Sequence, residues 1–191
     1  MPTARLLLTG LAATLLTASA ALAQAPAAVP APAPTPAPAP AAAPTVPDAM
    51  PFDVPYGMPI SLDQAHKALT AAAADARKRN WKMSITVVDP AGNLVAHATM
   101  DGTQYGSIAI SQGKARTAAL YRRPSKVFED RANSGGPSVI SLLALTQGAA
   151  SEGGFPIVID GKLVGAIGVS GGTSGQDALI ARVGLDALGI K

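Results

Sequence analysis

Cysteine is absent from the 191 residues of this chain. Its absence excludes a disulfide framework, a thiolate metal site, a lipid anchor on cysteine and the covalent attachment of a c-type haem. A domain without disulfides depends on its hydrophobic core for stability, and about 140 residues are enough to build one. The chain is therefore expected to fold without covalent cross-links.

Aromatic and charged residues are also scarce, at 4% and 14% of the chain. The formal net charge is only +3, and the basic residues are scattered apart from Arg77-Lys78-Arg79 and Arg122-Arg123. Proteins that bind nucleic acids usually carry a basic stripe together with aromatic residues. The composition therefore argues against a nucleic-acid partner.

Histidine occurs only twice, which limits the chemistry of any active site. A metallohydrolase needs a cluster of histidines and carboxylates, and Ser170 lacks the G-x-S-x-G turn of a hydrolase nucleophile. Asp89, Asp101 and Asp160 lie in expected turns, where aspartate serves the backbone. No convincing catalytic constellation emerges, so the sequence leans against an enzyme and leaves the question open.

The N-terminal residues have the pattern of an export signal. Arg5 precedes an apolar run over residues 6–16, and Ala21 and Ala23 form an A-x-A cleavage site before Gln24. The run is shorter than the roughly 20 apolar residues that span a membrane. Residues 1–23 are therefore predicted to be a signal peptide, with no membrane span, and the mature protein is predicted to be periplasmic or secreted.

The residues that follow are mostly alanine and proline up to Pro47. Proline removes backbone donors, and alanine offers little surface from which to build a core. We therefore predict a disordered linker over residues 24–49 and one folded domain over residues 50–191.

Helical patterns recur along this domain. Ser61 and Gln64 form a capping box, and Ser174 and Asp177 have the same spacing before a later helical stretch. The predicted helices cover residues 61–79, 107–121 and 174–188, with a short helix from residue 125 and a loop over residues 133–137.

Two hairpins are predicted from alternating apolar residues around turn residues. The strands cover residues 83–89 with 94–100, and residues 155–159 with 162–170. In the last strand, Gly165 and Gly168 imply the close approach of another backbone or a ligand. The order helix, hairpin, helices, hairpin, helix indicates an α+β domain with an antiparallel sheet packed against helices.

Four stretches, in a fixed order, resemble one known family. They read ITVVDPAGNL (85–94) with MDG (100–102), KARTA (114–118) before RPS (123–125), EGGFPI (152–157), and DGKLVGAIGVSGG (160–172). From Ser61 onward the chain resembles the GlcG/HbpS-like haem-binding family, also called the haem-degrading domain. The resemblance implies a profilin-like fold with a five-stranded antiparallel sheet flanked by helices, assembly into homo-oligomers, and binding of haem or iron by some members.

Haem iron commonly takes histidine, methionine or tyrosine as an axial ligand when cysteine is absent. The candidates are His66, His97, Met58, Met83, Met100, Tyr105 and Tyr121. His66 falls on the apolar stripe of its predicted helix, which makes it half-buried, either as an iron ligand or as a core histidine bonded to a carbonyl. His97 faces away from Leu94 and Ala96, so it is exposed if those residues fill the core. We predict haem as the cofactor, with His66 as the metal ligand ahead of His97.

Basic residues around the second helix are candidates for the carboxylates of a ligand. Lys114, Arg116 and Arg123, with Arg122, could meet haem propionates, or they could form a solvated basic surface. The Gly171-Gly172 loop could bind an anion or simply cap a helix. Two functions follow: an exported haem- or iron-binding protein, or an enzyme or enzyme accessory acting on a small carboxylate held by Lys114, Arg116 and this loop.

Overall fold

The computed structural model describes residue 50, residues 52–135 and residues 137–189. The predicted signal peptide (1–23) and the predicted linker (24–49) lie outside the described residues. In this described part, no helix is both long enough and apolar enough to cross a membrane.

The sheet has four antiparallel strands in the order β2-β1-β4-β3. The strands are β1 (Ser84–Val88), β2 (Leu94–Thr99), β3 (Gly154–Ile159) and β4 (Lys162–Ser170). The two predicted hairpins are therefore present, and each joins strands that are neighbours along the chain. β1 and β4 form the centre of the sheet, which explains why all five residues of β1 are buried.

The expected fifth strand is not present among the described residues, so that prediction is wrong. The segment before the first helix makes only an isolated parallel bridge, between Tyr56 and Leu163. Pro55 and Pro59 flank this bridge, and proline has no N–H to donate to a ladder of hydrogen bonds. The segment therefore lies against the start of β4 without forming a strand.

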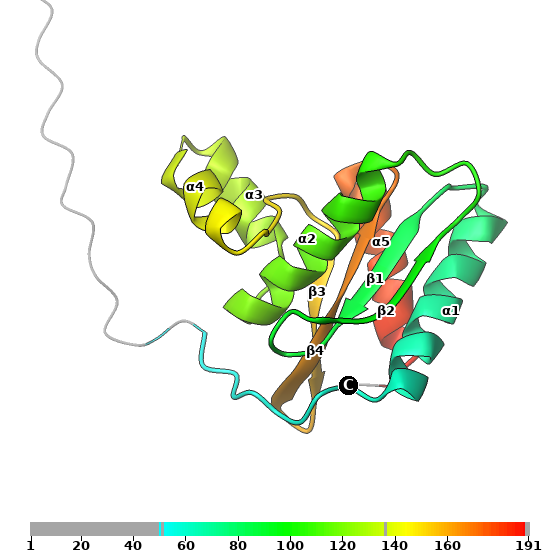
Figure 1. The fold of residues 1–191 in the computed structure, drawn as a ribbon, viewed down its shortest axis with the longest axis horizontal. Coiled ribbons are helices and arrows are strands. Elements are labelled where there is room, and N and C mark those ends of the chain that lie inside the picture. Colours follow the sequence, from blue (N-terminus) through cyan, green and yellow to red (C-terminus); the bar gives the residue numbers. More distant parts are fainter. Residues whose placement is uncertain (1–49, 51, 136, 190–191) are drawn as a thin grey trace, which may run out of the picture. The chain divides into compact units, whose positions relative to one another are not determined.

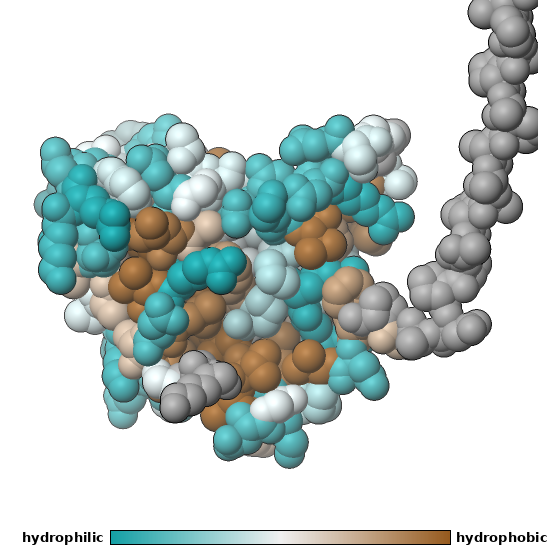
Figure 2. All heavy atoms as spheres, turned by 180° about the vertical axis from the view of Figure 1, so that it is seen from behind, coloured by the Kyte–Doolittle hydropathy of each residue, from teal (hydrophilic) through white to brown (hydrophobic). Residues whose placement is uncertain are grey.

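Helices cover both faces of the sheet (Figure 1). The helices are α1 (Leu62–Lys78), α2 (Gly106–Tyr121), α3 (Lys126–Asn133), α4 (Pro137–Leu145) and α5 (Ser174–Asp186). α1 and α5 pack against one face through the larger hydrophobic core, in which alanines of both helices meet Ile85, Val87 and Ile167. α2 packs against the other face through a small cluster of alanines with Val88. Seen from behind, hydrophobic side chains gather in the middle and lower part of the molecular surface (Figure 2).

The helix boundaries largely agree with the prediction. The capping box of Ser61 and Gln64 starts α1 as expected. The final helix starts differently, because the box is formed by Thr173 and Gln176 and not by Ser174 and Asp177. α4 was not predicted. Its sequence signal is Val139 and Leu143, which are spaced four residues apart and are both buried.

The predicted close approach at Gly168 is confirmed, and the approaching group is the backbone of α2. A Cβ atom on Gly168 would overlap the carbonyl oxygen of Ser111 and would lie 2.5 Å from the backbone nitrogen of Ala115. Glycine is therefore required here for α2 to lie close against β4. This close packing brings the side chains of α2 into contact with those of β1.

Candidate functional site

His97 lies on β2, opposite Thr86 of β1, with its side chain on the α2 face of the sheet. It is partly buried. The expectation of an exposed residue assumed that both Leu94 and Ala96 fill the core, whereas Leu94 is exposed. Its Nδ1 lies 2.8 Å from the Thr86 hydroxyl, and its Nε2 lies 2.9 Å from the Thr99 hydroxyl. Both ring nitrogens are thus held by hydroxyl groups, one on the buried side and one on the exposed side.

A chain of hydroxyl groups continues from Thr86 into the interior. The Thr86 and Ser111 oxygens are 2.9 Å apart, and Ser84 lies 3.2 Å from both Ser111 and Thr99. Ser84, Thr86 and Ser111 are completely buried. Buried hydroxyl groups need partners, and these residues satisfy one another across the interface between β1 and α2.

The direction of this chain selects one tautomer of His97. The Ser111 hydroxyl donates to the carbonyl oxygen of Ile108, which can only accept. The Ser111 oxygen must therefore accept the proton of the Thr86 hydroxyl. Thr86 has no proton left for the imidazole, so Nδ1–H donates to Thr86 and Nε2 keeps a lone pair. Nε2 accepts from the Thr99 hydroxyl on the exposed side.

Burial lowers the pKa of His97 below its ordinary value of 6.5. The imidazole is therefore neutral at pH 7, which is the form that coordinates metals. Histidines that bind metals usually donate their second ring N–H to a fixed partner, which orients the ring. Thr86 holds Nδ1 of His97 in this way, which leaves Nε2 as the ring nitrogen that could coordinate a metal.

His66 lies on α1 and is exposed, so the prediction that it is half-buried on an apolar stripe is wrong. The buried face of α1 consists of alanines, including Ala65, Ala68 and Ala72. One residue turns a helix by about 100°, which places His66 beside this face. The burial that favoured His66 as the iron ligand ahead of His97 is therefore absent.

The other candidate ligands are dispersed. Met83 is completely buried in the main core, and Tyr121 packs in a smaller cluster beneath α3. Met58 and Tyr105 are 82% and 91% exposed. Met100 is partly buried at the end of β2 and lines a surface groove with Thr99.

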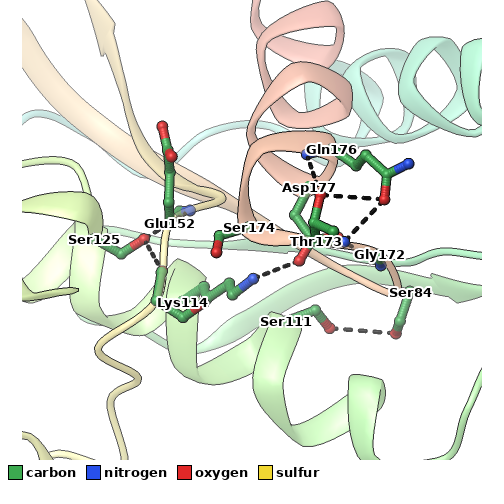
Figure 3. A network of polar contacts seen from close by, with 12 residues as sticks. Ser84, Ser111, Lys114, Ser125, Glu152, Gly172, Thr173, Ser174, Gln176 and Asp177 are labelled. Carbon is green, nitrogen blue, oxygen red and sulfur yellow. Dashed lines mark hydrogen bonds and ion pairs between the residues drawn. The ribbon is translucent and has the colours of Figure 1, made fainter.

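Lys114 is buried and forms an ion pair with Asp177 (Figure 3). The Lys114 Nζ donates to Asp177 Oδ2 at 2.7 Å, and the two side chains are 1% and 3% exposed. Lys114 lies in the middle of α2, and Asp177 lies in the first turn of α5. The pair therefore joins helices on opposite faces of the sheet, beyond the end of β4.

The other two predicted cations also have partners within the domain. Arg116 donates from Nη1 to Gln147 at 2.9 Å. The Arg123 guanidinium lies over the rings of Phe52 and Phe128, at 3.4 and 5.2 Å from their centroids. Among the described residues, no hydrogen bond or ion pair joins Lys114, Arg116 or Arg123 to either histidine.

The backbone N–H groups at the end of the Gly171-Gly172 loop are already bonded to side chains of α5. The Gly172 N–H donates to Asp177 Oδ1, and the Thr173 N–H donates to Gln176 Oε1. These donors are the ones that an anion would need, so the capping alternative explains the loop. The site expected for a small carboxylate thus has its lysine, its arginine and these two loop N–H groups already bonded inside the protein.

Sequence reasoning missed the hydroxyl residues Ser84, Thr86, Thr99 and Ser111. The signal that could have found the first two is their alternation with Met83, Ile85 and Val87 in one strand, which places two hydroxyls on a single buried face. Ser111 and Thr99 join them only through the packing of α2 and the register of β2. Among the described residues, no group of three or more histidine and acidic side chains comes together to hold a metal.

Comparison with known proteins agrees with this architecture. The family model described as haem degrading protein HbpS-like matches residues 60–186. The protein GlcG of Escherichia coli (strain K12) is 41% identical over 111 residues, which are 58% of this chain and 81% of GlcG.

Two solved structures share the fold. A double mutant of Streptomyces reticuli HbpS has a TM-score of 0.63 and 29% identity, covering 78% of this chain and 99% of that chain. A PduOC–haem complex has a TM-score of 0.65 and 24% identity, covering 70% of this chain and 98% of that chain. The sequence motifs, the fold and the match over residues 60–186 agree: this chain belongs to the HbpS-like family of haem-degrading proteins.

Proposed function

We propose that this protein is an exported haem-binding protein in which His97 supplies the axial ligand to the iron. The observation that carries the proposal is the oriented, neutral imidazole. Thr86 holds Nδ1 at 2.8 Å from the buried side, and among the described residues the partner of Nε2 is the hydroxyl of the exposed Thr99. A hydroxyl on an exposed residue can turn to water, which frees the Nε2 lone pair for iron.

The residues around His97 fit haem better than they fit a bare metal ion. A bare ion needs several protein ligands, whereas haem iron has four nitrogen ligands from its own macrocycle and takes one or two more from the protein. His97 alone is then sufficient. The family match, and the haem complex solved for PduOC, support the same ligand.

Replacing His97 by alanine is expected to weaken haemin binding at least tenfold, or about 1.4 kcal/mol. The His66→Ala variant is the matched control, because it removes an exposed histidine and is expected to retain the wild-type affinity. Haemin titration followed at the Soret band measures both, with circular dichroism to show that the fold is retained. Wild-type affinity and an unchanged Soret maximum in His97→Ala would show that this histidine is not the ligand.

Haem binding through Nε2 is also expected to depend on pH. The pKa of His97 in the folded protein is below the ordinary value of 6.5. The imidazole without bound iron is therefore neutral at pH 7, and it gains a proton as the pH falls through this lowered pKa. Protonation of Nε2 removes the lone pair that binds iron.

The export that we propose rests on the N-terminal pattern. Processing after Ala23 predicts that the mature chain begins at Gln24, which N-terminal sequencing of the exported protein measures. A chain that retains Met1 in the membrane fraction would contradict it.

Assembly into a homo-oligomer also stays a prediction. The hydrophobic side chains gathered on the surface in Figure 2 support it, since such patches often mark interfaces.

A further inference from the structure

The polar side chains around His97 form a closed ring of hydrogen bonds between β1, β2 and α2. Nδ1 of His97 lies 2.8 Å from the Thr86 hydroxyl, which lies 2.9 Å from the Ser111 hydroxyl. Ser84 lies 3.2 Å from both the Ser111 and the Thr99 hydroxyls, and Figure 3 shows its bond to Ser111. The Thr99 hydroxyl lies 2.9 Å from Nε2 of His97, which closes the ring. Each member thus has a partner on both sides, so the direction of one hydrogen bond limits the direction of the next.

Ser111 is the member of this ring whose proton is used outside it. Its hydroxyl donates to the carbonyl oxygen of Ile108 at 2.9 Å, in the preceding turn of α2. Within the ring its oxygen can therefore only accept. Ser111 is completely buried, and it lies at the close approach of α2 to β4, where a Cβ on Gly168 would overlap its carbonyl oxygen. The packing of α2 thus presents a fixed acceptor to the Thr86 hydroxyl.

The acceptor on Ser111 controls the proton of His97 through Thr86. A neutral imidazole has a single N–H, and the hydrogen bond made at one ring nitrogen decides which nitrogen carries it. In water the side chain of histidine prefers the Nε2–H form, so the Nδ1–H form needs support from the protein. With Ser111 in place, Thr86 donates to Ser111 and accepts from Nδ1–H. Without it, the remaining acceptor for Thr86 in the ring is Nδ1 itself, so the imidazole proton would move to Nε2.

We propose that Ser111 is a positioning residue for His97: through Thr86 it keeps the imidazole proton on Nδ1 and leaves the Nε2 lone pair free for haem iron. The binding of iron in this inference rests on the proposed function, whereas the position of the proton does not. If Ser111 were absent, coordination through Nε2 would return the proton to Nδ1 and leave the Thr86 hydroxyl without an acceptor in the ring. Thr86 is completely buried, and a buried polar group without a partner is costly. Removal of the Ser111 hydroxyl therefore weakens iron binding at His97.

The test compares Ser111→Ala with the matched control Ser107→Ala. Ser107 lies one turn earlier on α2 and is also completely buried, but its hydroxyl has no hydrogen-bond partner among the described residues. Long-range nitrogen–proton correlation spectra of the iron-free protein, with isotopically labelled histidine at neutral pH, report which ring nitrogen carries the proton. The chain has two histidines, so His66 serves as the internal reference for His97.

The wild type and Ser107→Ala are expected to carry the His97 proton on Nδ1 and to bind haemin equally well. In Ser111→Ala the proton is expected on Nε2, and haemin affinity, measured at the Soret band, is expected to fall about tenfold. The signals of His66 are expected to stay unchanged in all three proteins, and circular dichroism shows that the fold is retained.

The two measurements separate this inference from the proposed function. A wild-type His97 protonated on Nε2, or a Ser111→Ala variant that keeps the proton on Nδ1, overturns the role of Ser111 whether or not haem binds. A proton moved to Nε2 with unchanged haemin affinity overturns it as well, because the position of the proton would then not control binding. An equal loss of affinity in Ser107→Ala also overturns it, since removal of any buried hydroxyl of α2 would suffice. Wild-type haemin affinity in His97→Ala instead overturns the proposed function, and the iron-free spectra still decide the position of the proton.

Discussion

Replacing Asp177 by asparagine is expected to destabilise the domain by about 3–5 kcal/mol, the usual cost of removing one partner from a buried ion pair. The Lys114 ammonium, which is 1% exposed, would lose its carboxylate partner, and the amide that replaces the carboxylate would present N–H groups to it. The asparagine oxygen can still accept the N–H of Gly172, so the loop before α5 keeps that bond. Urea unfolding followed by circular dichroism measures the loss.

The matched control is the double variant Lys114→Met/Asp177→Asn. It removes both charges and fills the space of the lysine stem with an apolar side chain of similar length. Neutral replacements of buried ion pairs are often tolerated, so the double variant is expected to recover most of the stability that Asp177→Asn loses. If Asp177→Asn unfolds at the same urea concentration as the wild type, the ion pair between Lys114 and Asp177 is not shielded from water as the structure shows it.

Replacing Gly168 by alanine is expected to cost at least about 3 kcal/mol, at the upper end of the range for overpacked cores. The new Cβ would meet the carbonyl oxygen of Ser111 and the backbone nitrogen of Ala115. Backbone atoms cannot turn aside as the end of a side chain can, so α2 would have to move away from β4. That movement would also separate Ser111 from Thr86, and haemin affinity is therefore expected to fall together with stability.

The control for this variant is Gly175→Ala, in the first turn of α5. No atom lies within 4 Å of a Cβ at this position, and alanine is a better helix former than glycine by about 1 kcal/mol. Gly175→Ala is expected to leave stability unchanged or slightly higher in thermal and urea unfolding. Equal stability of the Gly168 and Gly175 variants would contradict the close packing of α2 on β4.

The sequence by itself determined the elements whose signals are local. The capping box of Ser61 and Gln64 specifies the start of α1 because both hydrogen bonds form within one turn. The turn residues between the paired strands likewise specified both hairpins, and the order of elements specified the α+β class. The motifs over residues 85–172 were sufficient for the family, which the match over residues 60–186 confirms.

Other features were decided only by tertiary structure, because they depend on residues far apart in the chain. From the sequence, Lys114 was a candidate either for binding a ligand carboxylate or for a solvated surface, and its actual partner, Asp177, lies 63 residues later. His97 is oriented by Thr86 from a neighbouring strand and, through it, by Ser111 from α2. His66 is exposed because it lies one residue away from the buried face of α1. An apolar pattern made mostly of alanines does not define this face sharply enough to separate neighbouring residues. Periodicity indicates which face of an element can be buried, whereas the partners of a polar side chain are set by the packing of elements against one another.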